Sequence, residues 1–440
     1  MGINKLLKGV VVSICTATIF TGCGNKVEME IVKEKESSID GKQIELNLWS
    51  HYGGMENVIS SFEKENPNVK VNLKVFEHIE YEKEYKKSLM LENGEADLFI
   101  IDSNDYGNFN SINGLENLLK TEYNARSYEK DFDKELWELG KSLDKRELLG
   151  IPIASAPIVT YYRKDIMEKY GFPGEPEELA EFMKDKENWF EIGKTLKKDG
   201  ISIVQWYAEL VRISSSNMPY FNENLEYQRN DKDFEEAIDI AIKAQEFGLG
   251  AHADIWMEAG MKALKEDKLA MLYLGSWGSN DLANMVPEQK GKWRVTSLPF
   301  GLYGWNNASI MAMAGNSTKK EVAWKFIEHI AFKHVDADSV GNLPGYLPFR
   351  KQNEANKPNE FLGGQNEQEV YKNSLEKTEE YSVTPLDKDA FSLWDQEVND
   401  GLEEGLTASH IMQNISAQIE NKFSKTIELL KKESKIGKEE

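Results

Sequence analysis

Few residues of the types that catalyse reactions or bind metal ions occur in a suitable pattern. Asp102–Gly107 begins like a calcium-binding loop, but Tyr106 stands at a ligand position and no Glu closes the loop. The six histidines show no zinc-binding spacing, and the two cysteines, Cys15 and Cys23, both lie near the N-terminus. We therefore expect no metal ion, no cofactor and no cysteine nucleophile in the folded part of the chain.

The acidic residues could supply the paired carboxylates of a glycoside hydrolase. There are 75 of them among the 440 residues, but none lies in a catalytic motif. The formal net charge of −22 argues against a nucleic-acid partner, because such proteins need basic surface to displace counterions from phosphates. A solvated acidic surface explains this charge, and a cationic ligand is the alternative.

The N-terminal segment is predicted to direct export. Lys5 and Lys8 precede the apolar run Gly9–Phe20, which is too short to span a bilayer. Phe20–Cys23 resembles a bacterial lipobox, in which a cysteine is lipidated before cleavage on its N-terminal side. We expect residues 1–22 to be a lipoprotein signal peptide and Cys23 to be lipidated. The protein would then be extracytoplasmic and anchored to the cell membrane, with residues 23–43 as a flexible tether.

Strand and helix patterns alternate after the tether. Ile44–Trp49 and Val69–Val75 alternate apolar and polar residues as strands do, and Leu98–Ile101 is a continuous apolar run typical of a buried parallel strand. Residues at helical spacing, beginning at Met55 and at Tyr81, lie between them. This βαβαβ series predicts a sheet that binds ligands beyond the carboxyl ends of its strands.

Proline-containing segments interrupt this alternation. Leu148–Tyr170 opens with a strand at Gly150–Pro152 that is predicted to break at Pro157, before the apolar run Ile158–Tyr161. A strand interrupted in this way predicts a segment that leaves one sheet and enters another. Arg294–Phe300 is the predicted return crossing, and Gly341–Arg350 a third. We expect an α/β fold of two lobes, each a sheet flanked by helices. The predicted first lobe comprises 44–153 and 299–333, the second 157–293 and 334–430, and 431–440 is a predicted disordered tail.

Six segments, in this order, resemble the bacterial extracellular solute-binding proteins of ATP-driven (ABC) importers, within the group that binds maltodextrins and other oligosaccharides. They are Phe62–Val71, Ala96–Asp102, Gly150–Phe172, Lys268–Leu282, Leu298–Gly301 and Lys320–Ile330. The resemblance implies a two-lobed receptor, without catalytic activity and expected to be monomeric. It would capture a carbohydrate in the interlobe cleft and deliver it to a membrane permease.

A sugar has apolar CH faces and hydroxyl edges, so its site needs aromatic platforms and polar side chains. Trp277, between Ser276 and Gly278 after an apolar strand, is the strongest candidate and matches the cleft tryptophan of the family. The other predicted ligand-binding residues follow strands or lie on crossings: Trp49, His51, Tyr52, Asp102, Asp105, Trp206, Tyr207, Tyr303, Trp305 and Tyr346. Six tryptophans are instead predicted to pack in the core: Trp137, Trp189, Trp256, Trp293, Trp324 and Trp394.

Two other functions are compatible with the sequence. One is a surface glycoside hydrolase. The other is a receptor of the same type for a different solute, such as a polyamine or a peptide, and the acidic composition makes a cationic solute conceivable.

Overall fold

The computed structural model describes residues 43–333, 343–350, 357–378 and 383–436. The predicted signal peptide, Cys23 and nearly all of the predicted tether lie outside these residues. Among the described helices, none is both long enough and apolar enough to cross a membrane.

The first lobe is built on three parallel strands, as the alternating pattern predicts. They are β1 (Ile44–Ser50), β2 (Val69–Val75) and β3 (Leu98–Asp102), in the spatial order β2-β1-β3. Helices α1 (Glu56–Glu65) and α2 (Tyr81–Met90) connect them. The carboxyl ends of all three strands therefore meet at one edge of the sheet.

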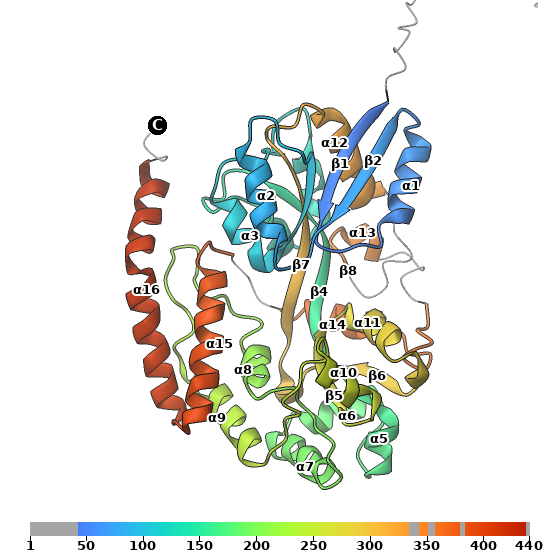
Figure 1. The fold of residues 1–440 in the computed structure, drawn as a ribbon, viewed down its shortest axis with the longest axis vertical. Helices are drawn as coiled ribbons and strands as arrows, with labels where there is room; N and C mark the ends of the chain where they lie inside the picture. The colour runs from blue at the N-terminus through green and yellow to red at the C-terminus, as the bar shows by residue number, and fades with distance from the viewer. Residues whose placement is uncertain (1–42, 334–342, 351–356, 379–382, 437–440) are drawn as a thin grey trace, which may run out of the picture. The chain divides into compact units, whose positions relative to one another are not determined.

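Two long antiparallel strands, β4 (Gly150–Arg163) and β7 (Gly304–Met313), pass through both lobes (Figure 1). In the first lobe β7 also pairs with β3, and in the second β4 pairs with β5 (Met271–Gly275) and β6 (Trp293–Thr296). The pairing of β4 with β7 shifts register between Pro152 and Ala154 and between Ala156 and Pro157. The prolines therefore make irregularities in one continuous strand, and the predicted first crossing is confirmed without the predicted break.

The other two crossings differ from the prediction. The return crossing is β7, since β6 ends at Thr296 and Pro299–Gly301 forms a short 3₁₀ turn. In the third crossing, β8 (Leu343–Pro344) pairs with β4, and helix α13 (Leu347–Arg350) follows. The Tyr346 ring packs against Phe132 at 5.9 Å. Residues 343–350 therefore pack on the first lobe and not, as predicted, on the second.

Helices surround this sheet. Those of the first lobe are α3 (Ser103–Asn110), α4 (Lys134–Leu139) and α12 (Lys320–Glu328), with a 3₁₀ turn at Ala125–Asp131 and a π turn at His329–Lys333. Those of the second lobe are α5 (Lys164–Lys169), α6 (Pro176–Met183), α7 (Lys186–Lys197), α8 (Ala208–Ser214), α9 (Lys232–Glu246), α10 (Glu258–Lys265), α11 (Gly278–Met285), a 3₁₀ turn at Pro287–Gln289, α14 (Gln368–Leu375), α15 (Asp387–Glu404) and α16 (Ala408–Ile436).

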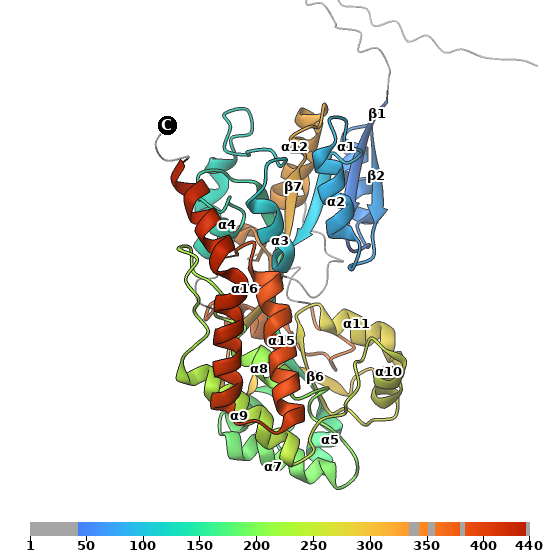
Figure 2. The ribbon, with the colours of Figure 1, turned by 60° about the vertical axis from the view of Figure 1, so that its left-hand side comes forward.

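The C-terminal helices α15 and α16 lie side by side and α16 also contacts α9 (Figure 2). The Ile411, Ile415 and Ile419 side chains of α16 are buried, which anchors the helix by one apolar stripe. Since α16 continues to Ile436, the prediction of a disordered tail beginning at residue 431 is wrong for residues 431–436.

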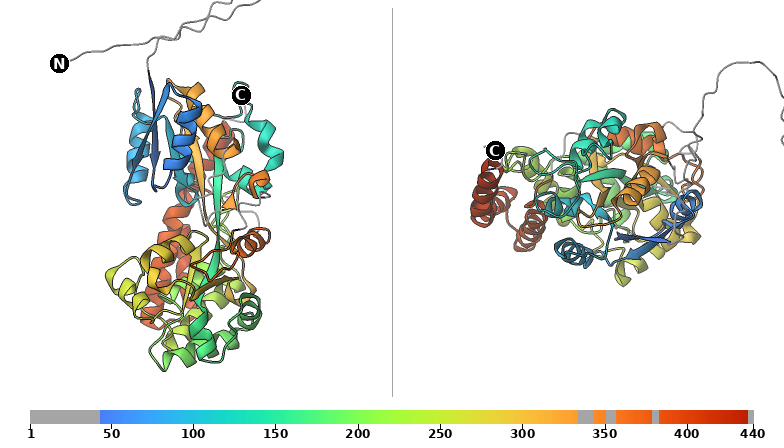
Figure 3. Two further views of the ribbon diagram at one scale, coloured as in Figure 1. Left: turned by 90° about the vertical axis from the view of Figure 1, so that its right-hand side faces the viewer. Right: turned by 90° about the horizontal axis from the view of Figure 1, so that it is seen from above.

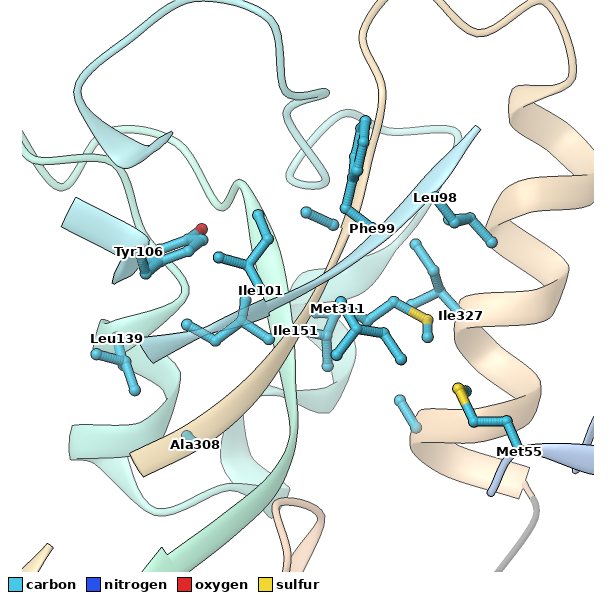
Figure 4. Close-up of a cluster of buried hydrophobic side chains, with 14 of the residues drawn as sticks. Met55, Leu98, Phe99, Ile101, Tyr106, Leu139, Ile151, Ala308, Met311 and Ile327 are labelled. Carbon is cyan, nitrogen blue, oxygen red and sulfur yellow. The ribbon is translucent and has the colours of Figure 1, made fainter. Parts of the chain in front are cut away.

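Two clusters of buried hydrophobic side chains hold the sheet to its helices. Figure 4 shows part of the first-lobe core, where Ile101, Ile151 and Met311 come from three neighbouring strands. In the second lobe, Tyr161 belongs to one cluster and Tyr162 to the other, and both are fully buried. Successive residues of β4 thus face opposite, equally covered sides of the sheet, which supports the predicted sheet flanked by helices.

Candidate functional site

The carboxyl ends of β1, β2 and β3 bring together a group of polar and aromatic side chains, here called the strand-edge cluster: His51, Tyr52, His78, Tyr81, Asp102 and Asp105. The His51 ring is stacked on Tyr81, with 5.1 Å between ring centroids, and lies 5.4 Å from the ring of His78. The Tyr81 hydroxyl donates a hydrogen bond to Asp105. Four of the predicted ligand-binding residues, His51, Tyr52, Asp102 and Asp105, therefore lie together, as the parallel strands require.

Burial governs the charge state of this cluster. It lowers the pKa of His51 to about 4, an effect that His78 increases and Asp105 opposes. Burial likewise raises the pKa of the Tyr52 hydroxyl to about 12. It also raises the pKa of Asp102, although this carboxylate accepts hydrogen bonds from the Asn104 N–H at 2.9 Å and the Asn307 side chain at 2.7 Å. At pH 7 the His51 and Tyr52 side chains are thus neutral hydrogen-bonding groups.

Two of the predicted ligand-binding residues, Trp49 and Asp105, contact other side chains of the protein. Trp49 is only 5% exposed and packs against Phe76, Tyr85 and Phe99. Both faces of β1 are covered at this end of the strand. The role of Trp49 in ligand binding stays a prediction, since Trp305, in the wall of the pocket described below, is just as buried. Asp105 is buried too, and besides Tyr81 it pairs with Lys388 at 2.7 Å.

A pocket lies between α4 of the first lobe and α14 of the second, and encloses about 680 Å³ including its opening to solvent. The predicted residue Trp305, from β7, lies in its wall. Arg350 is held there by hydrogen bonds from Nη1 to Asp133 at 2.6 Å and from Nε to the Pro344 carbonyl at 2.7 Å. This interlobe pocket is lined by Asp133, Glu135, Leu136, Leu139, Trp305, Arg350, Leu375, Glu376 and Thr378. It combines an indole ring with carboxylates and a guanidinium, which is a suitable lining for a polar solute with apolar faces.

The second lobe presents an aromatic pair, Trp256 and Trp277, with ring centroids 6.0 Å apart. Trp277 is half-buried at the start of α11, and its ring lies over Gly275, where a Cβ atom would be 2.3 Å from the indole nitrogen. Trp256 is 49% exposed, so the prediction that it packs in the core is wrong, whereas the other five tryptophans predicted to do so are buried. Helices α10 and α11 lie on the same side of β4 and β7 as β1 and β2 (Figure 3, left).

The remaining predicted residues lie apart from these groups. Trp206 is half-buried, with the Arg212 guanidinium 5.7 Å from its ring, and Tyr207 is buried with its hydroxyl 3.3 Å from Nε2 of His252. The Tyr303 hydroxyl accepts a hydrogen bond from Lys377, just beyond α14. Tyr346 packs in an aromatic group of the first lobe with Phe132 and Phe332.

Sequence reasoning missed three residues of this region: His78, Trp256 and Arg350. His78 follows β2 as His51 follows β1, so the same strand-end rule could have found it. Arg350 ends the predicted third crossing and is its only cation. No signal distinguished Trp256, because its exposure results from how the loop before α10 is placed.

Residues 49–333 match the sequence profile of the family described as bacterial extracellular solute-binding protein. The chain belongs to this family. It is 28% identical over 249 residues to a lactose-binding protein of Rhizobium radiobacter. That alignment covers 50% of this chain and 55% of the relative, so the chain spans about half the length of this curated protein.

Solved structures of solute-binding proteins share the fold. One is the galacto-N-biose-/lacto-N-biose I-binding protein of an ABC transporter from Bifidobacterium longum, in complex with lacto-N-biose, with a TM-score of 0.73 and 16% identity over 88% of this chain and 98% of that one. Another is the ABC transporter associated binding protein of B. animalis subsp. lactis in complex with β-1,6-galactobiose, with a TM-score of 0.70 and 19% identity over the same shares. The predicted two-lobed α/β fold is thereby confirmed.

Proposed function

We propose that this solute-binding protein is a lipid-anchored extracytoplasmic receptor, which captures an oligosaccharide between its lobes and delivers it to an ABC-type permease. The observation that carries the proposal is the interlobe pocket, in which Trp305 lies among side chains from both lobes. Carboxylates such as Glu376 would accept hydrogen bonds from sugar hydroxyls, and Arg350 would donate them. The indole of Trp305 would stack on the apolar face of a sugar ring.

Closure of the two lobes follows from the same arrangement. A ligand shifts a conformational equilibrium only by the additional contacts that it makes in the favoured state. In the interlobe pocket, Leu136 of α4 belongs to the first lobe, and Leu375 at the end of α14 belongs to the second. A sugar that touches both residues would stabilise the state in which they are closest, and the permease would recognise that state. The known complexes with lacto-N-biose and β-1,6-galactobiose support a disaccharide or longer ligand.

A thermal-shift screen of disaccharides, oligosaccharides, polyamines and short peptides tests the ligand class. A ligand present at 100 times its Kd adds about 2.7 kcal/mol of stability. We expect a galactose- or glucose-containing oligosaccharide to raise the Tm and every amine and peptide to leave it unchanged. If only a polyamine or a peptide raises the Tm, the carbohydrate assignment is wrong. Release of reducing sugar by the purified protein would instead favour a glycoside hydrolase.

Two alanine variants test which aromatic residues bind the ligand. Removal of a stacked indole loses both apolar burial and the ring contact, so Trp277→Ala and Trp305→Ala should each weaken sugar binding at least tenfold in calorimetry, equivalent to about 1.4 kcal/mol. Phe247→Ala is the matched control, since Phe247 is 40% exposed at the end of α9 and lines no described pocket of this region. Unchanged sugar affinity in both tryptophan variants would exclude these rings from the site.

The membrane anchor is tested separately. Cells expressing the full chain and fed a labelled fatty acid should label the wild-type protein, and Cys23→Ser should abolish the label. A released, unlabelled wild-type protein would contradict lipid anchoring without affecting the proposal for the ligand.

A further inference from the structure

Within the strand-edge cluster, three potential metal ligands come from the ends of three neighbouring strands. His51 follows β1, His78 follows β2, and Asp102 is the last residue of β3. Each offers one ligand atom, and these three atoms all lie within 4.8 Å of one another. Residues far apart in the sequence are thus brought together by the order β2-β1-β3, which is why no zinc-binding spacing is visible along the chain.

The distances suit a transition-metal ion after a small adjustment. In tetrahedral Zn²⁺ sites, Zn–N and Zn–O distances near 2.0–2.1 Å place the donor atoms about 3.3 Å apart. The three atoms must therefore move together by at most about 1.5 Å. His78 can supply this movement because it is exposed on the loop after β2, whereas His51 is held by stacking on Tyr81 and edge-on contact with Tyr52.

The surroundings of His51 and Asp102 are compatible with metal binding. Nε2 of His51 is buried and has no hydrogen-bond partner among the described residues, so its lone pair or proton is not used by another side chain there. Asp102 is oriented by hydrogen bonds from Asn104 and Asn307, one to each carboxylate oxygen, and each oxygen keeps a second lone pair. The nearby Asp105 carboxylate adds negative charge, which its contact with Lys388 partly offsets.

We propose that His51, His78 and Asp102 form a binding site for a divalent first-row transition-metal ion such as Zn²⁺. Two imidazoles and one carboxylate are ligands that Zn²⁺, Ni²⁺ and Co²⁺ accept and that Mg²⁺ does not prefer. Three protein ligands leave one coordination position for water or for an oxygen of a bound solute. The site does not depend on the identity of the transported solute.

The test uses the untagged full chain, freed of metal with EDTA and dialysed. Zn²⁺ should bind with one-to-one stoichiometry in calorimetry and raise the Tm, whereas Mg²⁺ should do neither. His78→Ala should lower the Zn²⁺ affinity at least tenfold and remove the Tm increase. Because His78 is exposed, this variant is expected to fold, and its Tm without metal checks that it does.

His410→Ala is the matched control, since His410 is exposed on α16 and far from β1 in the sequence. It should bind Zn²⁺ as the wild type does. Two outcomes would overturn the proposal: no Zn²⁺ binding at micromolar concentrations, or equal Zn²⁺ affinity of His78→Ala and the wild type. A second readout is the visible absorption of bound Co²⁺, which should be lost in His78→Ala and kept in His410→Ala.

Discussion

The contact between α3 and the segment that leads into α15 depends on a glycine, and Gly107→Ala should therefore destabilise the protein. Gly107 lies in α3, where a Cβ atom would be 2.0 Å from the Thr384 carbonyl oxygen and 2.4 Å from its carbon. These are backbone atoms, so no side-chain rotation can relieve the clash. The segment would have to move by about 1 Å, since real Cβ atoms essentially never approach within 3.0 Å and the closest atom lies at 2.0 Å.

Two opposing effects determine whether Gly107→Ala lowers or raises the free energy of unfolding. Alanine is the better helix former, and in a helix interior its replacement of Gly gains about 1 kcal/mol. Overpacking at a tight contact costs about 1–3 kcal/mol. The movement would also weaken the hydrogen bond from the Asn110 side chain to the Val383 carbonyl, a further loss of about 1 kcal/mol. The net expectation is a free energy of unfolding lowered by about 1–3 kcal/mol.

Urea denaturation followed by tryptophan fluorescence, together with the Tm, measures this difference. Gly53→Ala is the control, because nothing lies within 4 Å of a Cβ atom at Gly53 and its backbone does not need a positive φ. That variant should change stability by no more than about 0.5 kcal/mol, as most surface substitutions do. If Gly107→Ala unfolds at the same urea concentration as Gly53→Ala, the packing argument is refuted.

Three further substitutions test charged groups. Lys388→Met should lower the free energy of unfolding by about 1–2 kcal/mol, because it leaves the buried Asp105 carboxylate without its cation; equal urea midpoints would contradict this. Arg163→Lys should cost a similar amount, since lysine cannot reproduce the two parallel hydrogen bonds to Asp165, and the same titration measures it. Burial raises the pKa of Glu209 to about 7, so the wild type loses stability as pH rises from 4.5 through 7. Relative to the wild type, Glu209→Gln should therefore gain about 3 kcal/mol between pH 4.5 and 7.5, and a pH-independent difference would refute this origin.

The regular elements could be predicted because local patterns determine them. The strands β1, β2 and β3 match the predicted segments to within one residue at each end, and the alternation of strand and helix led directly to parallel pairing. The site residues after β1 and β3 followed from the same topology. This success depends on a geometric rule, namely that the carboxyl ends of parallel strands share one edge.

What failed was the prediction of which side chains are exposed. Trp49 is one of the last three residues of β1, which are all buried because helices and neighbouring strands cover both faces there, and its role in ligand binding stays a prediction. Trp256 was expected in the core but lies exposed beside Trp277. Apolar composition alone does not distinguish a covered tryptophan from one that a loop presents to solvent. The first crossing was predicted correctly, but Pro157 was taken to break a strand that continues through an irregularity.

The connection between the lobes limits how they can move. β4 and β7 remain paired from Gly150 opposite Ala312 to Ile158 opposite Gly304. These two connections between the lobes are therefore paired strands and not unpaired loops. Movement of the lobes would bend this pair of strands, to which β8 adds a short third strand at Ala154 and Ser155. The irregularity between Ala156 and Pro157, just beyond β8, is where the shifted register would resist bending least. Trp305 pairs with Pro157 at this irregularity and lines the interlobe pocket. A solute bound against its ring would therefore contact the strand pair at the place where it would bend. In the proposed receptor, coupling between binding and closure would need no signal transmitted through either lobe, since Trp305 lines the proposed binding pocket and pairs with Pro157 at the irregularity.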